Sequence, residues 1–200
     1  MPGSTPTSAA RELLTSRLRL VAADARWATA LTAFHTDNRA HLEPWEPPVE
    51  TDFYTPAAQA ARLAELAARF DAGSGYHYLI QPIGDARRVI GSINFSDVAR
   101  SSHQSCHLGY ALDHCFEGQA LMTEALACAI GEMFSPHVNL HRIQAAVRPE
   151  NWRSVEVLKR LGFHDEGLAV DYLYIDGLWR THRLTALLNK RFVVPPDWPR

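Results

Sequence analysis

Residues 108–122 read LGYALDHCFEGQALM, and the fold of the chain is decided around this stretch. Its first part completes an expected strand at residues 106–112, and its last part opens a helix whose apolar residues recur at spacings of three and four. Small residues form the turn between the two. Such a turn leaves the first N–H groups of the helix without partners, beside the positive end of the helix dipole. The stretch therefore predicts a site for a pyrophosphate group.

The residues before this stretch predict an antiparallel meander. Strand-like runs separated by breaks short enough for hairpins lie at residues 76–81, 88–97 and 106–112. Alternation of polar and apolar residues at 17–21 predicts an earlier strand, and two helices are expected between that strand and the meander, at residues 24–38 and 57–70.

The residues after the central helix predict a second group of elements. These are a strand at residues 142–147, a helix at 151–161, and strands at 169–175 and 179–188. Asn151 is a suitable cap for the start of that helix and Gly162 for its end. The last two strands are joined by Asp176-Gly177, a hairpin signal. The order strand, helix, strand predicts a parallel crossover.

The order of elements predicts one α+β domain over residues 13–192, with tails at residues 1–12 and 193–200. The chain has 200 residues, of which 46% are hydrophobic and 21% charged, which is a normal globular composition. A formal charge of −2 gives no field that would attract nucleic acid or an anionic membrane. Neither a signal peptide nor a membrane-spanning run of apolar residues is recognised.

Cysteine and histidine spacing gives no indication of a disulfide framework or a metal site. The three cysteines contain no Cys-x-x-Cys pair, so a reducing, cytoplasmic location is expected. Two pairs of histidines spaced by four residues lie at breaks between expected elements rather than on a helix face, and no glutamate accompanies them as in a metalloprotease motif. We therefore expect no metal.

Several short motifs together resemble one family. They occur in order along nearly the whole chain: DNR at residues 37–39, LEPWEP at 42–47, NFS at 94–96, LGY at 108–110, the segment 151–163, and DYLYIDGLWR at 171–180. In these motifs the chain resembles the acetyl-CoA-dependent GNAT acetyltransferases, and within them the RimJ/RimL group that acetylates the N-termini of ribosomal proteins. The resemblance implies a mixed, mostly antiparallel sheet that is splayed between the strands at residues 108–112 and 142–147.

The resemblance also implies where acetyl-CoA, the co-substrate, binds. Backbone groups of residues 110–112 would pair with the pantetheine arm, and residues 118–122 would hold the pyrophosphate. The implied cofactor-binding residues are Tyr110, Ala111, Leu112, Glu117, Gly118, Gln119, Ala120, Leu121, Met122 and Asn151. Ser154 matches the hydroxyl that protonates the CoA sulfur, and Asp171 matches the acidic position that serves as the general base.

The acceptor implied by the resemblance is the N-terminal α-amine of a protein, in particular a small-subunit ribosomal protein that begins with Ala. An α-amine has an ordinary pKa near 7.7–8.0, against about 10.4 for lysine, so it needs only modest help to lose its proton. The prolines of residues 44–48 exclude regular structure there, and this loop supplies Trp45 and Glu46 as candidate substrate-binding residues. The expected assembly is a monomer or a homodimer.

Two residues depart from the family pattern at the pyrophosphate turn. Glu117 stands where Gln or Arg is usual, and Ala120 stands where Gly is usual. A left-handed Ala120 would cost about 1–2 kcal/mol, and a carboxylate facing a phosphate would weaken binding further. Glu117 pointing outward would be harmless. Two alternatives therefore stay open beside the N-terminal acetyltransferase: an acetyltransferase for a small-molecule amine, and a degenerate acetyl-CoA-binding regulatory protein.

The candidate residues also have structural interpretations. Asn151 can be explained as a helix cap and nothing more, which would contribute about 1 kcal/mol to stability. Ser154 can be simply a residue of the first helical turn, and Asp171 a solvated strand residue. Trp45 can be a packing aromatic and Glu46 an ordinary exposed carboxylate.

Overall fold

The computed structural model describes residues 9–196 and Trp198. In this part of the chain one eight-stranded sheet has the order β1-β2-β3-β4-β5-β6-β8-β7. Its strands are β1 (Glu12–Leu14), β2 (Leu18–Ala22), β3 (Tyr76–Pro82), β4 (Gly91–Ala99), β5 (Ser105–Leu112), β6 (Arg142–Val147), β7 (His164–Ile175) and β8 (Leu178–Leu188). The expected α+β class is confirmed.

The first half of the sheet is the expected meander. Strands β1 to β5 are joined in order by antiparallel pairing, in which His77 of β3 lies opposite Asn94 of β4, and Asn94 lies opposite Gly109 of β5. Strand β4 begins at Gly91 and not at residue 88 as expected. Residues 85–88 form a turn in which the Arg88 N–H donates to the Asp85 carbonyl. Regular pairing of β4 with β3 therefore begins only after this turn.

The second half contains the expected parallel crossover, with one strand inserted in it. Strands β6 and β7 run in the same direction, but β8 lies between them and pairs antiparallel with both. The direct parallel pair is β5 with β6, whose connection contains helix α4 (Leu121–Met133). The hairpin at Asp176-Gly177 is confirmed, because both residues have positive φ (51° and 72°) and Ile175 pairs with Leu178.

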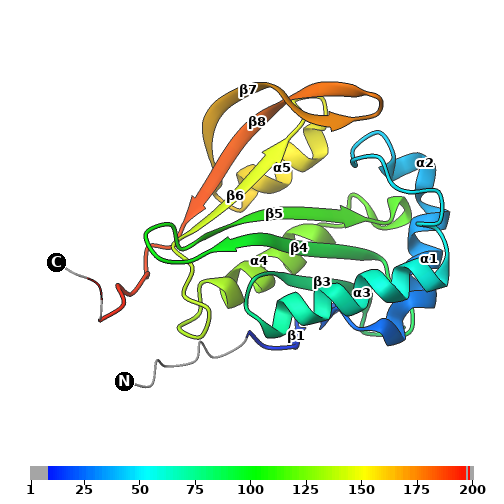
Figure 1. The fold of residues 1–200 in the computed structure, drawn as a ribbon, viewed down its shortest axis with the longest axis horizontal. Coiled ribbons are helices and arrows are strands. Elements are labelled where there is room, and N and C mark those ends of the chain that lie inside the picture. The colour runs from blue at the N-terminus through cyan, green and yellow to red at the C-terminus, as the bar shows by residue number, and fades with distance from the viewer. Residues whose placement is uncertain (1–8, 197, 199–200) are drawn as a thin grey trace.

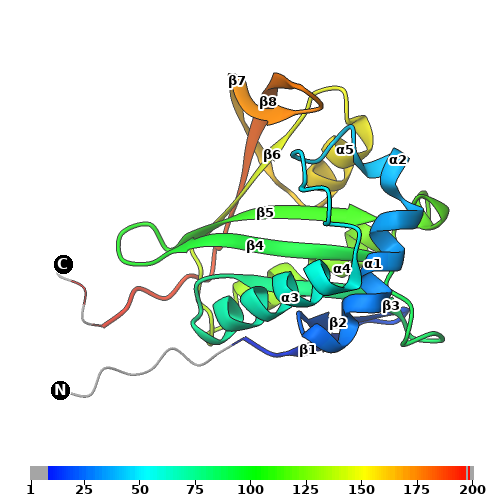
Figure 2. The ribbon, with the colours of Figure 1, turned by 45° about the vertical axis from the view of Figure 1, so that its right-hand side comes forward.

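Strands β5 and β6 separate soon after they meet. Only residues 105–107 of β5 pair with β6, at residues 142–144. From Leu108 to Leu112, β5 pairs with β4 alone. In Figures 1 and 2, β6, β8 and β7 lean away from β5 on this side. The edge of β5 that faces the gap therefore has backbone groups without ladder partners.

Helices cover both faces of the sheet. One face packs on α4, with Tyr78, Ile93 and Leu126 in its core. The other face packs on the N-terminal helices, with Leu79, Leu31 and Leu63 in a second core. The helices besides α4 are α1 (Ala28–Asp37), α2 (Arg39–Leu42), α3 (Pro56–Asp71) and α5 (Trp152–Arg160), with short 3₁₀ turns η1 (Ala25–Trp27) and η2 (His114–Phe116).

Side chains of the expected type set the helix starts. Thr55 accepts a hydrogen bond from the Ala58 N–H at the start of α3, and Pro56 takes the first helical position. The Asn151 side chain accepts from the Ser154 N–H at 3.2 Å at the start of α5. The predicted helix at residues 24–38 is present as η1 followed by α1, with Asp24 as the cap.

The described ends of the chain are packed, in contrast to the expected tails. Ala9 is only 4% exposed, and the Tyr78 hydroxyl donates to the Ala10 carbonyl at 2.7 Å. At the other end the Asn139 amide donates to the Val193 carbonyl at 2.8 Å. The chain therefore packs against the rest of the domain at both Ala9 and Val193. The rest of the expected tails, residues 1–8, 197 and 199–200, lies outside the described residues.

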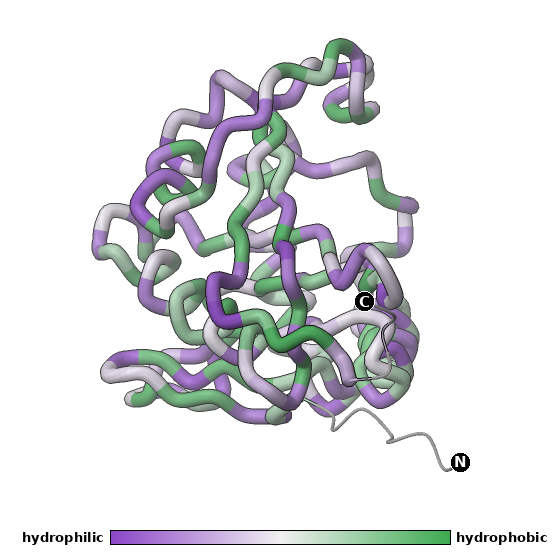
Figure 3. Tube along the Cα trace, turned by 90° about the vertical axis from the view of Figure 1, so that its left-hand side faces the viewer, coloured by the Kyte–Doolittle hydropathy of each residue, from purple (hydrophilic) through white to green (hydrophobic). Residues whose placement is uncertain are grey.

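Apolar stretches along the trace are short and are interrupted by hydrophilic ones (Figure 3). Among the described residues no helix has the length and apolar character required to span a membrane.

Candidate active site

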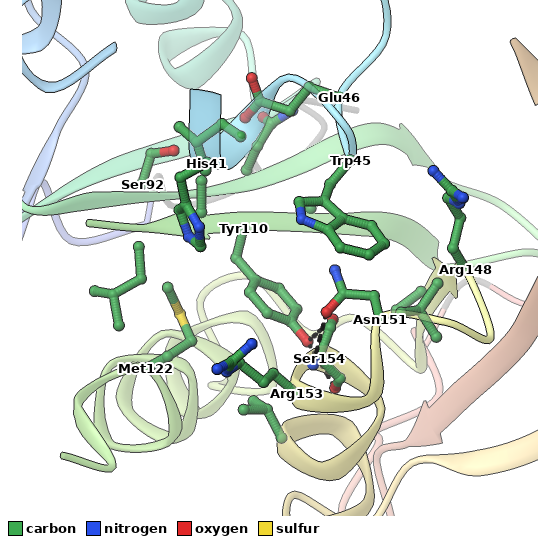
Figure 4. A pocket seen from close by; sticks show the side chains of 18 of the residues that line it. His41, Trp45, Glu46, Ser92, Tyr110, Met122, Arg148, Asn151, Arg153 and Ser154 are labelled. Carbon is green, nitrogen blue, oxygen red and sulfur yellow. Dashed lines mark hydrogen bonds between the residues drawn. The ribbon is translucent and has the colours of Figure 1, made fainter. Parts of the chain in front are cut away.

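The site is a cavity of about 960 Å³ at the gap between β5 and β6. Its walls come from β5, from the turn before α4, from the start of α5, and from the loop after α2. Figure 4 shows side chains from these separate elements converging on one space. Twelve of the fourteen residues selected from the sequence line this cavity: Trp45, Glu46, Tyr110, Ala111, Leu112, Glu117, Gly118, Ala120, Leu121, Met122, Asn151 and Ser154.

The turn before α4 has the geometry of an anion site. Gly118 has φ 73° and Ala120 has φ 58° and ψ 14°, so both are left-handed. Ala120 is the N-cap of α4, and its side chain makes no capping hydrogen bond. The N–H groups of the first turn of α4 therefore face the cavity end without a side-chain acceptor. The left-handed Ala120, raised as a possibility by the sequence, is present.

Glu117 lies between two basic side chains from other elements. Its carboxylate lies 3.3 Å from Arg153 Nε of α5 and 3.4 Å from His41 Nε2 of α2. The Glu117 side chain is 29% exposed. Its negative charge is thus compensated beside the turn, and does not face the expected phosphate position alone.

A hydrogen-bonded pair lies below the gap. The Tyr110 hydroxyl is 2.6 Å from Ser154 Oγ and 3.1 Å from the Ser154 carbonyl oxygen. Burial raises the pKa of Tyr110, and the hydrogen bond with Ser154 opposes this only in part. The phenol therefore stays protonated and can donate. Asn151, as the cap of α5, fixes the backbone that carries Ser154 (Figure 4).

The loop after α2 covers the cavity from the opposite side. The Arg148 guanidinium lies over the Trp45 ring, 5.1 Å from its centroid, and donates to the Pro44 carbonyl at 2.7 Å. These contacts hold the loop against the end of β6. In Figure 4 Trp45 reaches toward Asn151 across the cavity, and Glu46 lies farther from Ser154.

The inner end of the cavity is polar and buried. Burial raises the pKa of Glu46, although the charge of Arg62 opposes the shift. Burial lowers the pKa of His35 to about 4 and that of His77 to about 3. Both imidazoles are therefore neutral at neutral pH, and the Glu46 carboxyl and the Arg62 guanidinium line the same end of the cavity.

Gln119 and Asp171 do not line the cavity. Gln119 is exposed, and its carbonyl accepts a hydrogen bond from Arg17 at 3.0 Å. Asp171 is exposed on β7, has φ 49°, and lies within an irregular part of the β7–β8 ladder between Ala169 and Leu173. The catalytic part assigned to Asp171 by resemblance stays a prediction.

Sequence reasoning did not select several residues that the fold brings into the cavity. These are His35, His41, Arg62, His77, Arg148 and Arg153. Only Arg153 had a local signal, since it lies in the 151–163 segment next to Ser154. The others reach the cavity from distant elements, and no spacing in the sequence relates them.

One group of possible metal ligands occurs among the described residues. Asp113, His114 and Cys115 place one ligand atom each within 4.8 Å of one another. However, Asp113 pairs with Arg88 at 3.1 Å, and His114 Nδ1 is 2.8 Å from Asn38 Oδ1. These two side chains already have partners in the fold, so we assign no metal to the group.

The splayed sheet, the anion turn and the cavity between them define an acetyltransferase architecture. A family model described as Acetyltransferase (GNAT) domain matches residues 17–164. The chain belongs to the GNAT acetyltransferase family.

Individual relatives agree with this assignment. The chain is 41% identical over 187 residues to the [ribosomal protein uS5]-alanine N-acetyltransferase of Escherichia coli strain K12, which covers 93% of this chain and 92% of the relative. The crystal structure of a ribosomal-protein-S5-alanine acetyltransferase from Vibrio fischeri has a TM-score of 0.87 at 32% identity, over 92% of this chain and 99% of that one. Mycobacterium smegmatis RimJ, in complex with CoA-disulfide, has a TM-score of 0.81 at 30% identity, over 92% of this chain and 88% of that one.

Proposed function

We propose that this protein transfers the acetyl group of acetyl-CoA to the N-terminal α-amine of a ribosomal protein that begins with Ala. The observation that carries the reaction is the free edge of β5, which runs from the anion turn of α4 to the Tyr110–Ser154 pair. The acceptor is taken from the uS5-alanine N-acetyltransferase of E. coli, which the chain matches over nine-tenths of both lengths. A ribosomal acceptor implies action in the cytoplasm.

The residues present fit acetyl-CoA. The unpaired groups of residues 110–112 suit the amides of an extended pantetheine arm, as a further strand would. The uncapped first turn of α4, from Leu121 to Met122, suits the pyrophosphate. Arg153, paired with Glu117 at 3.3 Å, keeps that carboxylate from opposing the pyrophosphate. Such contacts would bring the thioester near Ser154, which supports the proposed cofactor-binding residues.

The reaction needs a neutral amine, a donor for the departing sulfur, and a route for the amine proton. As the amine nitrogen bonds to the acetyl carbon and the carbon–sulfur bond breaks, Ser154 Oγ would donate its proton to the departing sulfur, and it would regain a proton from solvent after the products leave. Tyr110 would supply the hydrogen bond that turns the serine proton toward the sulfur. The amine proton would leave through water to a carboxylate, for which Asp171 is the proposed base.

The buried loop end of the cavity would hold the acceptor. Glu46 is suited to attract the cationic α-ammonium as the acceptor enters the cavity, and Trp45 would line the path from there to the thioester beside Asn151. We assign both residues to the acceptor because they lie in the part of the cavity opposite the α4 turn.

The proposal is tested with two short peptides and acetyl-CoA, read by mass spectrometry. One peptide has a free N-terminal Ala and no Lys, and the other has a blocked N-terminus and one Lys. We expect an acetyl gain on the first peptide only. Gain on neither peptide, with acetyl-CoA binding intact by calorimetry, would redirect the proposal to small-molecule amines. If the protein neither acetylated a peptide nor bound acetyl-CoA, it would be a degenerate member of the family.

The control for this assay is Ser154→Ala. It should remove most of the acetyl gain while calorimetry still shows CoA binding, because Ser154 would act on the sulfur only as the bond breaks. Activity equal to the wild type would contradict the proposed proton donor but not the acceptor class.

A further inference from the structure

The deep end of the cavity lies on the face of the sheet opposite to α4. Along one row of this face, His77 of β3, Asn94 of β4 and Gly109 of β5 are direct cross-strand neighbours. All three line the cavity. A Cβ atom at Gly109 would meet nothing within 4 Å. The row is therefore an open path that leads from the gap beside β5 inward to His77.

His77 ends this path with unused hydrogen-bonding capacity. Its side chain is buried, with 5% exposure, and neither ring nitrogen has a hydrogen-bond partner of normal geometry among the described residues. Leaving a buried polar group unpaired destabilises a protein, so such groups are rare in native folds. The Asn94 side chain acts on the pKa of His77 as a weak hydrogen-bond partner, but it can serve only one ring nitrogen. A ring nitrogen without a partner on a cavity wall thus indicates a ligand.

The chemistry of the ring defines what it can bind. Burial lowers the pKa of His77 to about 3, with Arg62 adding to the shift and the Asn94 amide opposing it. The imidazole is neutral and presents one N–H donor and one acceptor nitrogen. It therefore suits a carbonyl or hydroxyl group rather than an ammonium.

We propose that His77 is an acceptor-binding residue, whose imidazole forms a hydrogen bond with a polar group within the first three residues of the acceptor protein. The inference rests on the proposed function. Two strand spacings separate Gly109 from His77, about 10 Å, and an extended chain covers this span in about three residues. The reacting amine would lie at the β5 gap, and the following residues or their side chains would extend toward His77.

The test compares the wild type with His77→Phe, which keeps an aromatic ring and removes both nitrogens. Acceptors of one, two and three residues, each with a free N-terminal Ala and an amidated C-terminus, are assayed at saturating acetyl-CoA. We expect kcat/KM of His77→Phe to fall about tenfold for the acceptor long enough to reach the ring, since one neutral hydrogen bond has this value. Shorter acceptors should show no difference.

Two further measurements separate binding from structure. The KM for acetyl-CoA should not change, and the Tm of His77→Phe should be no lower than that of the wild type, because the variant removes orphaned buried atoms. His77→Asn, which keeps one donor and one acceptor, should recover part of the lost kcat/KM.

Gln81→Met is the matched control. Gln81 is also buried on β3 and also has an unpartnered nitrogen, Nε2, but it does not line the cavity. The kcat/KM of Gln81→Met for each acceptor should equal that of the wild type. This result would show that removing an unpartnered atom on β3 is not by itself sufficient to lower kcat/KM.

Equal kcat/KM for wild type and His77→Phe at every acceptor length would overturn the inference. A fall in Tm of several degrees in His77→Phe would also overturn it, since His77 would then be needed for the fold. Failure of the wild type to acetylate any of these acceptors would contradict the proposed function instead. The Tm comparison would still test whether His77 is needed for the stability of the fold.

Discussion

At the scale of single residues, Ala120 shows how the anion turn is formed without the usual glycine. Its φ of 58° lies in the left-handed region, so alanine takes the backbone shape that glycine usually gives, at a cost in strain. The negative charge of Glu117 is compensated by Arg153. Both departures from the family pattern are therefore compatible with an anion turn.

The first prediction concerns Ala120→Gly. Relief of left-handed strain gains about 1–2 kcal/mol, and the greater freedom of glycine in the unfolded chain removes about 0.4–1 kcal/mol. We expect a net gain of about 0.5–1 kcal/mol, seen as a Tm about 1–4 °C higher. CoA affinity by calorimetry should not change. Gly118→Ala, at φ 73° with open space around its Cβ, should lower stability by a similar amount. Clearly tighter CoA binding by Ala120→Gly would show that the turn limits the cofactor.

The second prediction concerns Tyr110 and Ser154. Ser154→Ala should lower kcat by about 100-fold, the lower end of general acid contributions. Tyr110→Phe should lower kcat by on the order of tenfold, because it removes one hydrogen bond to the reacting hydroxyl. Steady-state kinetics should show an unchanged KM for acetyl-CoA in both variants. A raised KM with unchanged kcat would assign the pair to cofactor binding alone.

At the scale of elements, α4 carries both the anion turn and the attachment of the N-terminal hairpin. Glu124 in the first turn of α4 accepts hydrogen bonds from Thr15 Oγ1, Ser16 Oγ and the Arg17 backbone and side chain. Arg17 also donates to the Gln119 carbonyl. The β1–β2 turn thereby fixes the position of α4, and with it the N–H groups proposed to hold the pyrophosphate.

The third prediction is a pH dependence of stability at Glu124. Partial burial would raise the pKa of Glu124, but the hydrogen bonds from Thr15, Arg17 and Ser16 outweigh it and lower the pKa to about 2. A lowered pKa in the folded state means that the stabilisation is present above the ordinary value of 4.5 and is lost as pH falls toward 2.

Urea unfolding of Glu124→Gln should therefore show a loss of about 1–2 kcal/mol at pH 7, allowing for partial solvent screening. This difference from the wild type should shrink as pH falls from 4.5 toward 3. Glu65→Gln, at an exposed position of α3, is the control and should change neither the free energy of unfolding at pH 7 nor its dependence on pH. A difference that is constant with pH would contradict the ionic origin of the effect.

At the scale of the whole molecule, the site is assembled from both halves of the chain. The loop after α2 supplies Glu46 from the N-terminal half, and α5 supplies Ser154 from the C-terminal half, while Asp171, the proposed base, lies on β7 outside the cavity. Glu46 lies within the cavity, whereas Asp171 is exposed. The two carboxylates therefore have different proposed tasks: Glu46 binds the acceptor, and Asp171 accepts its proton through water.

The fourth prediction separates these tasks by kinetics. Glu46→Gln should raise the peptide KM about tenfold or more, as for loss of a charge-assisted hydrogen bond. Since burial raises the pKa of Glu46, peptide kcat/KM should fall on acidification at a pH above the ordinary carboxyl range, and this limb should vanish in Glu46→Gln. Asp171→Asn should instead lower kcat by about 100-fold. An unchanged pH–rate profile in Asp171→Asn would exclude Asp171 as the base.

The sequence alone determined the features that depend on neighbours along the chain. Apolar periodicity predicts α3 and α4, the dipeptide Asp176-Gly177 predicts the last hairpin, and Asn151 predicts the start of α5. The anion turn was likewise predictable, because its chemistry lies within the fifteen residues quoted first, at positions 108–122. These features follow from backbone geometry and local hydrogen bonds, which a few adjacent residues suffice to set.

Only the tertiary structure decided which distant residues meet. The insertion of β8 between β6 and β7, the pairing of Glu117 with Arg153, and the contact of Tyr110 with Ser154 join segments far apart in sequence. The same holds for His77, whose sequence position gives no sign that its ring ends a cavity without a partner. Burial and charge pairing depend on what the whole fold brings to a point in space, and no local pattern encodes that.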